Sequence, residues 1–264
     1  MINIRVSGLS FAYDGDPVLR NVSIEINSGE TLALVGPNGS GKTTLLKCIS
    51  GVLGGKEEQR CVFFDSKRLE DLRPRDVARM LAVVEAEIQT HFDFSVREVV
   101  ELGRIPYLGR MQALGKKDAE AISKAMRITD TALLADRPLS QLSSGERQRV
   151  WLAMALAQEP RVFLLDEPTA HLDLAYQSEI LELLRSLAAE GLCVVFSVHD
   201  LNLAALYADR VALLKGGELV TVGAPDEALT AERIEDVYGT SVQVIRHPQT
   251  GELQAILPAR RGKV

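Results

Sequence analysis

The strongest constraint on this chain is the sequence Gly36-Pro37-Asn38-Gly39-Ser40-Gly41-Lys42-Thr43, which matches the pattern G-x-x-x-x-G-K-[ST]. Residues 31–35 form an apolar run typical of a buried parallel strand, and residues 44–49 carry apolar side chains at helical spacing. A strand, a glycine-rich turn and a helix N-terminus direct several backbone N–H groups at one anion. This context favours a phosphate-binding loop over a glycine-rich turn that binds nothing.

Each type of side chain in this loop has a predicted role at a nucleotide site. The glycines let the main chain approach the phosphates, because they have no Cβ. Lys42 is long enough to reach the β- and γ-phosphates, and the Thr43 hydroxyl can bind Mg²⁺. The predicted nucleotide-binding residues of the loop are Gly36, Pro37, Asn38, Gly39, Ser40, Gly41, Lys42, Thr43 and Thr44.

Composition limits the class of protein. With 46% hydrophobic and 25% charged residues, the chain resembles an ordinary globular protein, and no apolar run approaches the roughly 20 residues of a membrane span. The first residues read as a strand rather than a signal peptide. A net charge of −6 argues against nucleic acid as the main partner. Cys48, Cys61 and Cys193 lack metal-ligand spacing, and we expect Cys48 and Cys193 to be core residues in a reducing, cytosolic compartment.

The order of predicted elements indicates an α/β chain with additions. Alternating patterns predict antiparallel strands near the N-terminus at 4–6, 9–13 and 22–26. Further strands are predicted at 62–64, 83–84, 162–166, 192–198, 211–214 and 218–220, and helices at 69–81 with an interruption at Pro74, 176–189 and 201–208. Between the strands lie a helix after the capping box Ser95-Val96-Arg97-Glu98, a helix at 116–128, and one from Ser143 or Ser144 to Gln158. These helices predict an inserted helical subdomain.

Other polar residues lie where a predicted helix begins or a predicted strand ends. The stretch 142–148, Leu-Ser-Ser-Gly-Glu-Arg-Gln, opens a helix and by itself could be only a cap. Asp166 and Glu167 follow one apolar strand, and His199 follows the next. Together with the phosphate loop, and in this order, these motifs resemble the ABC-type ATPases over residues 1–240. The resemblance implies a P-loop NTPase fold with a RecA-like parallel sheet core, an N-terminal antiparallel β subdomain, a helical subdomain over about 88–158 and a C-terminal extension at 241–264.

The resemblance also implies roles in ATP hydrolysis. Asp166 and Thr43 would hold Mg²⁺, since oxygen ligands suit that ion. Glu167 would orient or deprotonate the attacking water. His199 would contact the γ-phosphate, although a lone histidine after a strand is also common on an ordinary surface. Lys42, Glu167 and His199 are therefore the predicted catalytic residues.

Further implied roles concern the base of ATP and a second copy of the chain. Tyr13, at the end of a predicted strand, would stack on adenine; the alternative is a half-buried strand tyrosine. In the family, the signature loop (residues 142–148) caps the ATP held by the other protomer, so two chains sandwich two ATP molecules. The residues expected to do so are Ser143, Ser144, Gly145 and Gln148. The segment 169–173, here called the acidic loop, resembles the family's loop joining the two sites through Asp173, and we interpret His171 as loop surface.

One position departs from the family pattern. The family usually places a glutamine after the strand at 83–84, where it touches Mg²⁺ or water and connects to the membrane partner. Here that position is Ala86, preceded by Glu85. Alanine offers no oxygen, so we leave Ala86 out of the metal site and expect slower hydrolysis or weaker coupling. Gln89 could substitute only if the loop is rearranged.

Local similarities narrow the expected function to one subgroup. Residues 101–109 and three parts of the tail, 237–239, 246–251 and 256–258, resemble the subgroup that energises uptake of iron-siderophores, haem and vitamin B12 (cobalamin). The chain would then act at the cytoplasmic face of the inner membrane, peripherally, with integral membrane permease subunits and, indirectly, an extracytoplasmic binding protein. The aromatic stretch His91-Phe92-Asp93-Phe94 would line a groove for a permease helix or pack into the core.

Two other functions remain as alternatives. The first is a soluble ABC-type ATPase that acts in protein or cofactor assembly without a membrane partner. The second is a catalytically dead regulatory protein, which the intact set of Lys42, Asp166, Glu167 and His199 disfavours.

Overall fold

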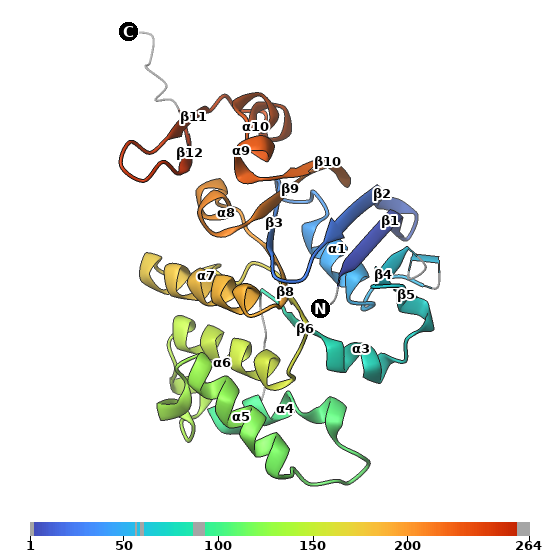
Figure 1. The fold of residues 1–264 in the computed structure, drawn as a ribbon, viewed down its shortest axis with the longest axis vertical. Coiled ribbons are helices and arrows are strands. Elements are labelled where there is room, and N and C mark those ends of the chain that lie inside the picture. The colour runs from blue at the N-terminus through green and yellow to red at the C-terminus, as the bar shows by residue number, and fades with distance from the viewer. Residues whose placement is uncertain (1–2, 56, 59–60, 87–92, 258–264) are drawn as a thin grey trace.

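The computed structural model describes residues 3–55, 57–58, 61–86 and 93–257, and its central feature is a sheet of order β10-β9-β3-β8-β7-β6 (Figure 1). Neighbouring strands from β9 to β6 are parallel, and β10 runs antiparallel to β9 at one edge. The strands are β3 (Thr31–Val35), β6 (Leu81–Val84), β7 (Val162–Leu165), β8 (Cys193–Ser197), β9 (Arg210–Lys215) and β10 (Glu218–Gly223).

The parallel strands are apolar because both faces of the sheet are covered. Every residue of β3, β7 and β8 is buried. Parallel register places the carboxyl ends of β3, β6, β7 and β8 along the same edge. Segments that follow these strands therefore meet there, which is where ligands bind in sheets of this kind.

A second, antiparallel sheet of order β2-β1-β4-β5 covers one side of the molecule. Its strands are β1 (Ile4–Tyr13), β2 (Asp16–Ile26), β4 (Val62–Phe64) and β5 (Lys67–Arg68). The first helix, α1 (Lys42–Ile49), packs between the two sheets in one hydrophobic cluster. The strands expected at 4–6 and 9–13 are one continuous strand with a register shift between Val6 and Leu9, because Gly8 takes a left-handed φ of +68°.

The helices of the predicted insertion lie between β6 and β7 in the chain and group together at one end of the molecule (Figure 1). They are α4 (Val96–Leu102), α5 (Lys116–Ile128) and α6 (Ser144–Ala157), with short 3₁₀ turns η2 (Ile105–Tyr107), η3 (Ala132–Leu134) and η4 (Leu139–Gln141). Ser95 and Ser143 each close a capping box, with Glu98 and Glu146. The predicted fold class is confirmed, whereas the subdomain boundaries stay a prediction.

Other helices cover the remaining sheet surface and the C-terminal side. They are η1 (Leu69–Asp71), α3 (Pro74–Met80), α7 (Leu174–Ala189), α8 (Leu201–Tyr207), α9 (Pro225–Ala228) and α10 (Ala231–Tyr238). The helix expected at 69–81 with an interruption at Pro74 is two elements, η1 and α3, separated by residues 72–73, and Pro74 begins α3, where its missing N–H costs nothing. A hairpin of β11 (Gln243–Arg246) and β12 (Leu253–Ile256) follows, held to α8 by the Asn202 side chain, which bonds the backbone of Ala255.

The expectation that Cys48 and Cys193 are core residues agrees with the structure. Cys48 and Cys193 are buried, and burial raises the pKa of each thiol to about 12, so both remain protonated at neutral pH. Within the part of the chain that the structure describes, no helix combines the length and apolarity needed to cross a membrane. Residues 258–264 of the expected C-terminal extension lie outside the described residues.

Candidate nucleotide-binding site

The phosphate loop surrounds a cavity of about 290 Å³ at the carboxyl edge of the sheet. Its lining consists of Val18, Asn38, Gly39, Ser40, Gly41, Lys42, Thr43, Thr44 and Glu167. Gly41, with φ of +101°, caps α1, and a Cβ there would lie 2.7 Å from the Leu19 side chain. A Cβ on Gly36 would overlap the carbonyl oxygen of Leu214. Glycine at both positions therefore lets the loop curl tightly against the sheet, with the N-terminus of α1 facing the cavity.

Lys42 is buried and lies within the curl of the loop. Its Nζ donates to the carbonyl oxygens of Gly36 at 2.8 Å and Pro37 at 3.2 Å. Burial lowers the pKa of the ammonium, while the negative charges of Glu167 and Asp166 act in the opposite direction. A triphosphate in the cavity would offer oxygens in exchange for these carbonyl contacts, and its charge would favour the protonated amine.

The acidic pair stands where β7 ends. Asp166 is buried, and its backbone N–H donates to the carbonyl of Val84 on the neighbouring strand. Ser197, at the end of β8 and fully buried, donates its hydroxyl to Asp166 Oδ1 at 2.6 Å. The same hydroxyl oxygen accepts the backbone N–H of Glu167 at 2.8 Å. One serine therefore orients both members of the pair.

Glu167 and His199 contact each other at the cavity. His199 Nε2 lies 2.5 Å from Glu167 Oε1, and the two side chains are 48% and 27% exposed. Glu167 holds a left-handed φ of +48°, which is uncommon for a residue with a side chain. Its N–H bond to Ser197 and the bond of its carbonyl with the Ala170 N–H fix that conformation. The histidine at the end of β8 is thus set beside the carboxylate at the end of β7.

The residues present fit Mg²⁺. The Thr43 residue is exposed at the cavity wall, and the Asp166 carboxylate is held in one orientation by Ser197. A hydroxyl and a carboxylate are hard oxygen donors, which Mg²⁺ prefers. Ala86 follows β6 beside this site and contributes only a methyl group, so Thr43 and Asp166 are the candidate protein ligands.

Other predicted residues lie apart from this cavity. Tyr13, at the end of β1, is 44% exposed and packs edge-to-face on Phe11, with ring centroids 4.8 Å apart. The signature residues Ser143, Ser144, Gly145 and Gln148 belong to the start of α6 and do not line the cavity, nor does the N-cap of α7, Asp173. The residues Gln89, His91 and Phe92 lie outside the described part of the chain.

Sequence reasoning missed three contributors to the site. Val18 of β2 lines the cavity, and Ser197 bonds the acidic pair. Gly217, in the β9–β10 turn, donates its N–H to the carbonyl of Ser40, so this turn supports the phosphate loop from the side. The strands on either side of this turn were predicted, at 211–214 and 218–220, but no local pattern indicates that the turn touches a loop so far away in the chain.

These features define a P-loop protein that binds a nucleoside triphosphate. Residues 19–170 match the protein family described as ABC transporter. The chain is 42% identical over 259 residues to the hemin import ATP-binding protein HmuV of Rhodococcus jostii, covering 98% of this chain and 87% of that protein. It is 39% identical over 249 residues to the ferric enterobactin transport ATP-binding protein FepC of Escherichia coli, covering 94% and 91%.

A solved structure gives the same assignment. It is described as a metal-chelate type ABC transporter in an inward-facing conformation, and it matches with a TM-score of 0.82 and 26% identity, covering 97% of this chain and 98% of that one. This chain belongs to the ABC transporter family and is an ATP-binding ATPase of that family.

Proposed function

We propose that this chain is the ATP-hydrolysing subunit of an importer for a metal chelate or cofactor of the iron-siderophore, haem or cobalamin class. The observation that carries the proposal is the convergence of Lys42 and Glu167 on one cavity, with Glu167 bonded to His199. Similarity to hemin and ferric enterobactin import proteins over nearly the whole chain supports the cargo class.

In this proposal each residue of the site has a task in hydrolysis. The loop amides and Lys42 bind the β- and γ-phosphates, and the N-terminus of α1 adds its positive end. Glu167 Oε1 accepts a proton from, or orients, a water beside the γ-phosphate, while His199 holds that carboxylate in place. Thr43 and Asp166 would hold Mg²⁺, which when bound would neutralise part of the triphosphate charge. Tyr13 is proposed to stack on the adenine.

We propose that the working form is a head-to-tail dimer. The signature residues, at the start of α6, do not line the cavity of their own chain. A helix N-terminus with small polar side chains suits a phosphate, so a second copy would bring this tip to the γ-phosphate. Asp173, in the acidic loop, would lie at the same interface.

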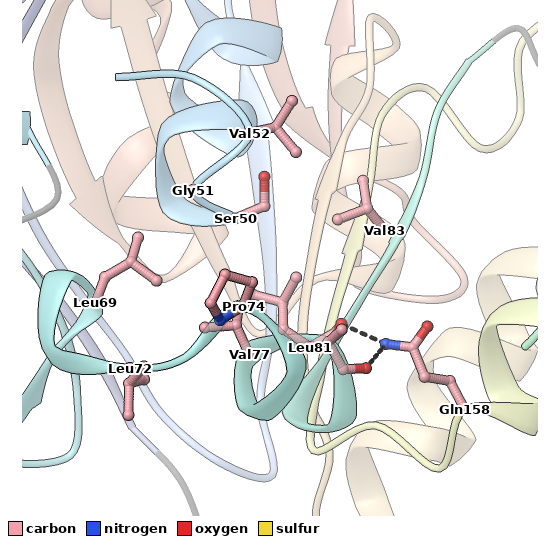
Figure 2. Close-up of a pocket in the computed structure, with 11 residues that line it drawn as sticks. Ser50, Gly51, Val52, Leu69, Leu72, Pro74, Val77, Leu81, Val83 and Gln158 are labelled. Carbon is pink, nitrogen blue, oxygen red and sulfur yellow. Dashed lines mark hydrogen bonds between the residues drawn. The ribbon is translucent and has the colours of Figure 1, made fainter. Parts of the chain in front are cut away.

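The proposed permease contact is a second cavity, of about 340 Å³, at the other end of α1 (Figure 2). Figure 2 shows Val52 and Gly51 above Pro74 and Val77, with Gln158 at the lower right. Gln158 caps α6 and donates to the carbonyls of Ala78 and, at 2.6 Å, Leu81. The cavity therefore touches the C-terminal ends of α1 and α6.

This placement suits mechanical coupling. Helix α1 has 8 residues, or about 12 Å at 1.5 Å per residue, and begins at the phosphate loop. Helix α6 begins at the signature residues. A short amphipathic permease helix seated in the cavity would thus contact the far ends of both elements that act on ATP. Val52, which lines the cavity and is 66% exposed, suits such a partner. The subunit would then be peripheral to the cytoplasmic face of the membrane, with a binding protein engaged only through the permease.

The test of hydrolysis and dimerisation is Glu167→Gln. Because the amide cannot accept the proton of water, ATPase activity should fall by roughly two orders of magnitude or more. ATP should remain bound, and sedimentation should show dimers with ATP and monomers without it. Hydrolysis at the wild-type rate would overturn the assignment of Glu167.

The test of the permease contact is Val52→Asp, with Leu133→Asp as control, since Leu133 is 96% exposed but belongs to η3. Wild type and the control should co-purify from membranes with a polytopic membrane protein, and Val52→Asp should not. Equal recovery by all three chains would overturn the contact at this cavity, and recovery of no membrane protein by wild type would contradict an importer and favour a soluble ATPase.

A further inference from the structure

We propose that Tyr176 is a positioning residue that joins the start of α6 to the acidic loop, so that both segments facing a second copy move as one unit. The consequence for ATP-driven dimerisation rests on the proposed function. The joint itself lies within a single chain.

The first contact is between Tyr176 and Gly145. A Cβ built on Gly145 would lie 2.6 Å from Tyr176 Cδ1, 2.7 Å from Cγ and 2.8 Å from Cε1. Gly145 is buried in the first turn of α6, and its φ is not positive. Glycine is therefore required here by the aromatic ring of α7 rather than by the backbone conformation. The ring fixes the distance between the two helix starts.

The second contact lies one helical turn along on the same face of α6. The Arg149 guanidinium lies 5.3 Å from the centroid of the Tyr176 ring. It pairs with Glu179 Oε2 of α7 at 3.8 Å and with Asp130 Oδ2 at 3.5 Å. The tyrosine ring is thus held between Gly145 and a partly buried cation, which limits its rotation.

The third set of contacts ties the same turn of α7 to the acidic loop. Asp173 Oδ1 accepts the backbone N–H of Tyr176 at 3.0 Å, which caps α7. Gln177 Nε2 donates to the carbonyls of Leu172 at 3.1 Å and Thr169 at 3.3 Å. The position of the loop is therefore set by residues adjacent to Tyr176.

These contacts make the Tyr176 ring the link between the start of α6 and the acidic loop. The amides of Ser144 and Gly145 precede the first intrahelical bond of α6, which Arg147 makes to Ser143, so they are the groups able to meet a partner's phosphate. A change in the packing of Tyr176 moves these amides relative to Asp173. The phosphate loop, which shares no residue with this joint, keeps its own affinity for ATP.

A measurement on the single chain tests the joint. Hydrogen exchange, read by mass spectrometry without nucleotide, should rise in both 143–147 and 169–173 when Tyr176 is replaced by alanine. Tyr176→Phe should restore protection, because the ring makes the contact. Ser178→Ala is the matched control, since it removes an α7 bond to Tyr207 on α8 instead. Increased exchange in only one segment, or in neither, would overturn the proposal.

A paired substitution tests the same contact without relying on one variant. Gly145→Ala should lower thermal stability in the wild-type chain and have little further effect in Tyr176→Ala, because the ring is then absent. Additive effects would show that Gly145 and Tyr176 do not act on each other, which would overturn the joint.

A dimerisation measurement distinguishes failure of this inference from failure of the proposed function. In a Glu167→Gln background, Tyr176→Ala should weaken ATP-driven dimerisation roughly tenfold, while the affinity of the monomer for a fluorescent ATP analogue is unchanged. Dimerisation equal to the parent would overturn the role of Tyr176 in closure. A parent that remains monomeric would instead contradict the proposed dimer, and the exchange measurement would still decide the joint.

Discussion

The hydroxyl of Ser197 lies 2.6 Å from Oδ1 of Asp166, joining the ends of β8 and β7 across the nucleotide site. The same oxygen accepts the N–H of Glu167 at 2.8 Å, so a single side chain sets the carboxylate of one residue and the backbone of the next. The geometry of the acidic pair thus depends on Ser197, which lies 31 positions after Asp166 in the chain.

Replacing Ser197 with alanine should impair metal use more than nucleotide binding. Two buried polar groups would lose their partner, at a cost of about 1–3 kcal/mol in the free energy of unfolding. The Asp166 carboxylate would no longer be oriented, so half-maximal ATPase activity should need several times more Mg²⁺. A magnesium titration at saturating ATP measures this.

The control for Ser197 is Ser186→Ala, whose hydroxyl bonds the Leu183 carbonyl on the exposed side of α7. Its magnesium dependence should match wild type. An unchanged magnesium requirement in Ser197→Ala would show that Asp166 is held by other groups.

Two adjacent glycines of the β9–β10 turn should respond differently to alanine. Gly216 and Gly217 both have left-handed φ, of +53° and +85°. A Cβ on Gly216 meets nothing within 4 Å, so its substitution should cost only the left-handed penalty of about 1–2 kcal/mol. A Cβ on Gly217 would overlap the Val18 carbonyl oxygen, so the turn must move away from the phosphate loop.

Gly217→Ala should therefore weaken ATP binding as well as stability, because the Gly217 N–H bond to Ser40 is lost. Urea unfolding and nucleotide titration measure the two effects. Equal ATP affinities for the two variants would contradict support of the loop by this turn.

The buried Arg104 network should make stability depend on pH at the acid end. Arg104 is 3% exposed and bonds Asp118 at 2.9 Å and Glu159 at 2.8 Å. The backbone N–H of Gly115 and then Arg104 lower the pKa of Asp118 in the folded chain. Since the folded pKa is below the unfolded one, the stabilisation is present above pH about 4 and is lost as pH falls through the folded pKa.

Asp118→Asn should therefore reduce stability at neutral pH and flatten its decline in acid, as urea unfolding at a series of pH values would show. Arg104→Met should cost about 3–5 kcal/mol, since it leaves a buried carboxylate without its cation. An identical acid profile for wild type and Asp118→Asn would refute the contribution of this carboxylate.

Ala86→Gln should raise ATPase activity if the missing amide is the limiting group. Ala86 follows β6, whose Val84 carbonyl accepts the Asp166 N–H, so a glutamine there starts beside the metal ligand. Glu85→Gln is the control, because it places the same amide one residue earlier, on a side chain that pairs with Lys47 of α1 at 3.6 Å. Unchanged basal and partner-stimulated rates in Ala86→Gln would make the position irrelevant.

Much of this site could be predicted because its determinants are neighbours in the chain. The phosphate loop, the capping boxes at Ser95 and Ser143 and the buried strands depend on backbone geometry and side-chain periodicity within a few residues. Those interactions form wherever the segment lies, so the residues alone specify them. The same holds for Asp166 and Glu167, which come directly after a buried strand.

The residues alone determined the chemistry of this protein: a phosphate loop, an acidic pair and a histidine, each at the end of a strand. Only the tertiary structure decided which distant groups hold that chemistry in place. Ser197 meets Asp166 because β8 lies beside β7, and Gly217 meets Ser40 because β9 lies beside β3. Strand order arises from packing of the whole sheet, which leaves no mark in the few residues around either partner.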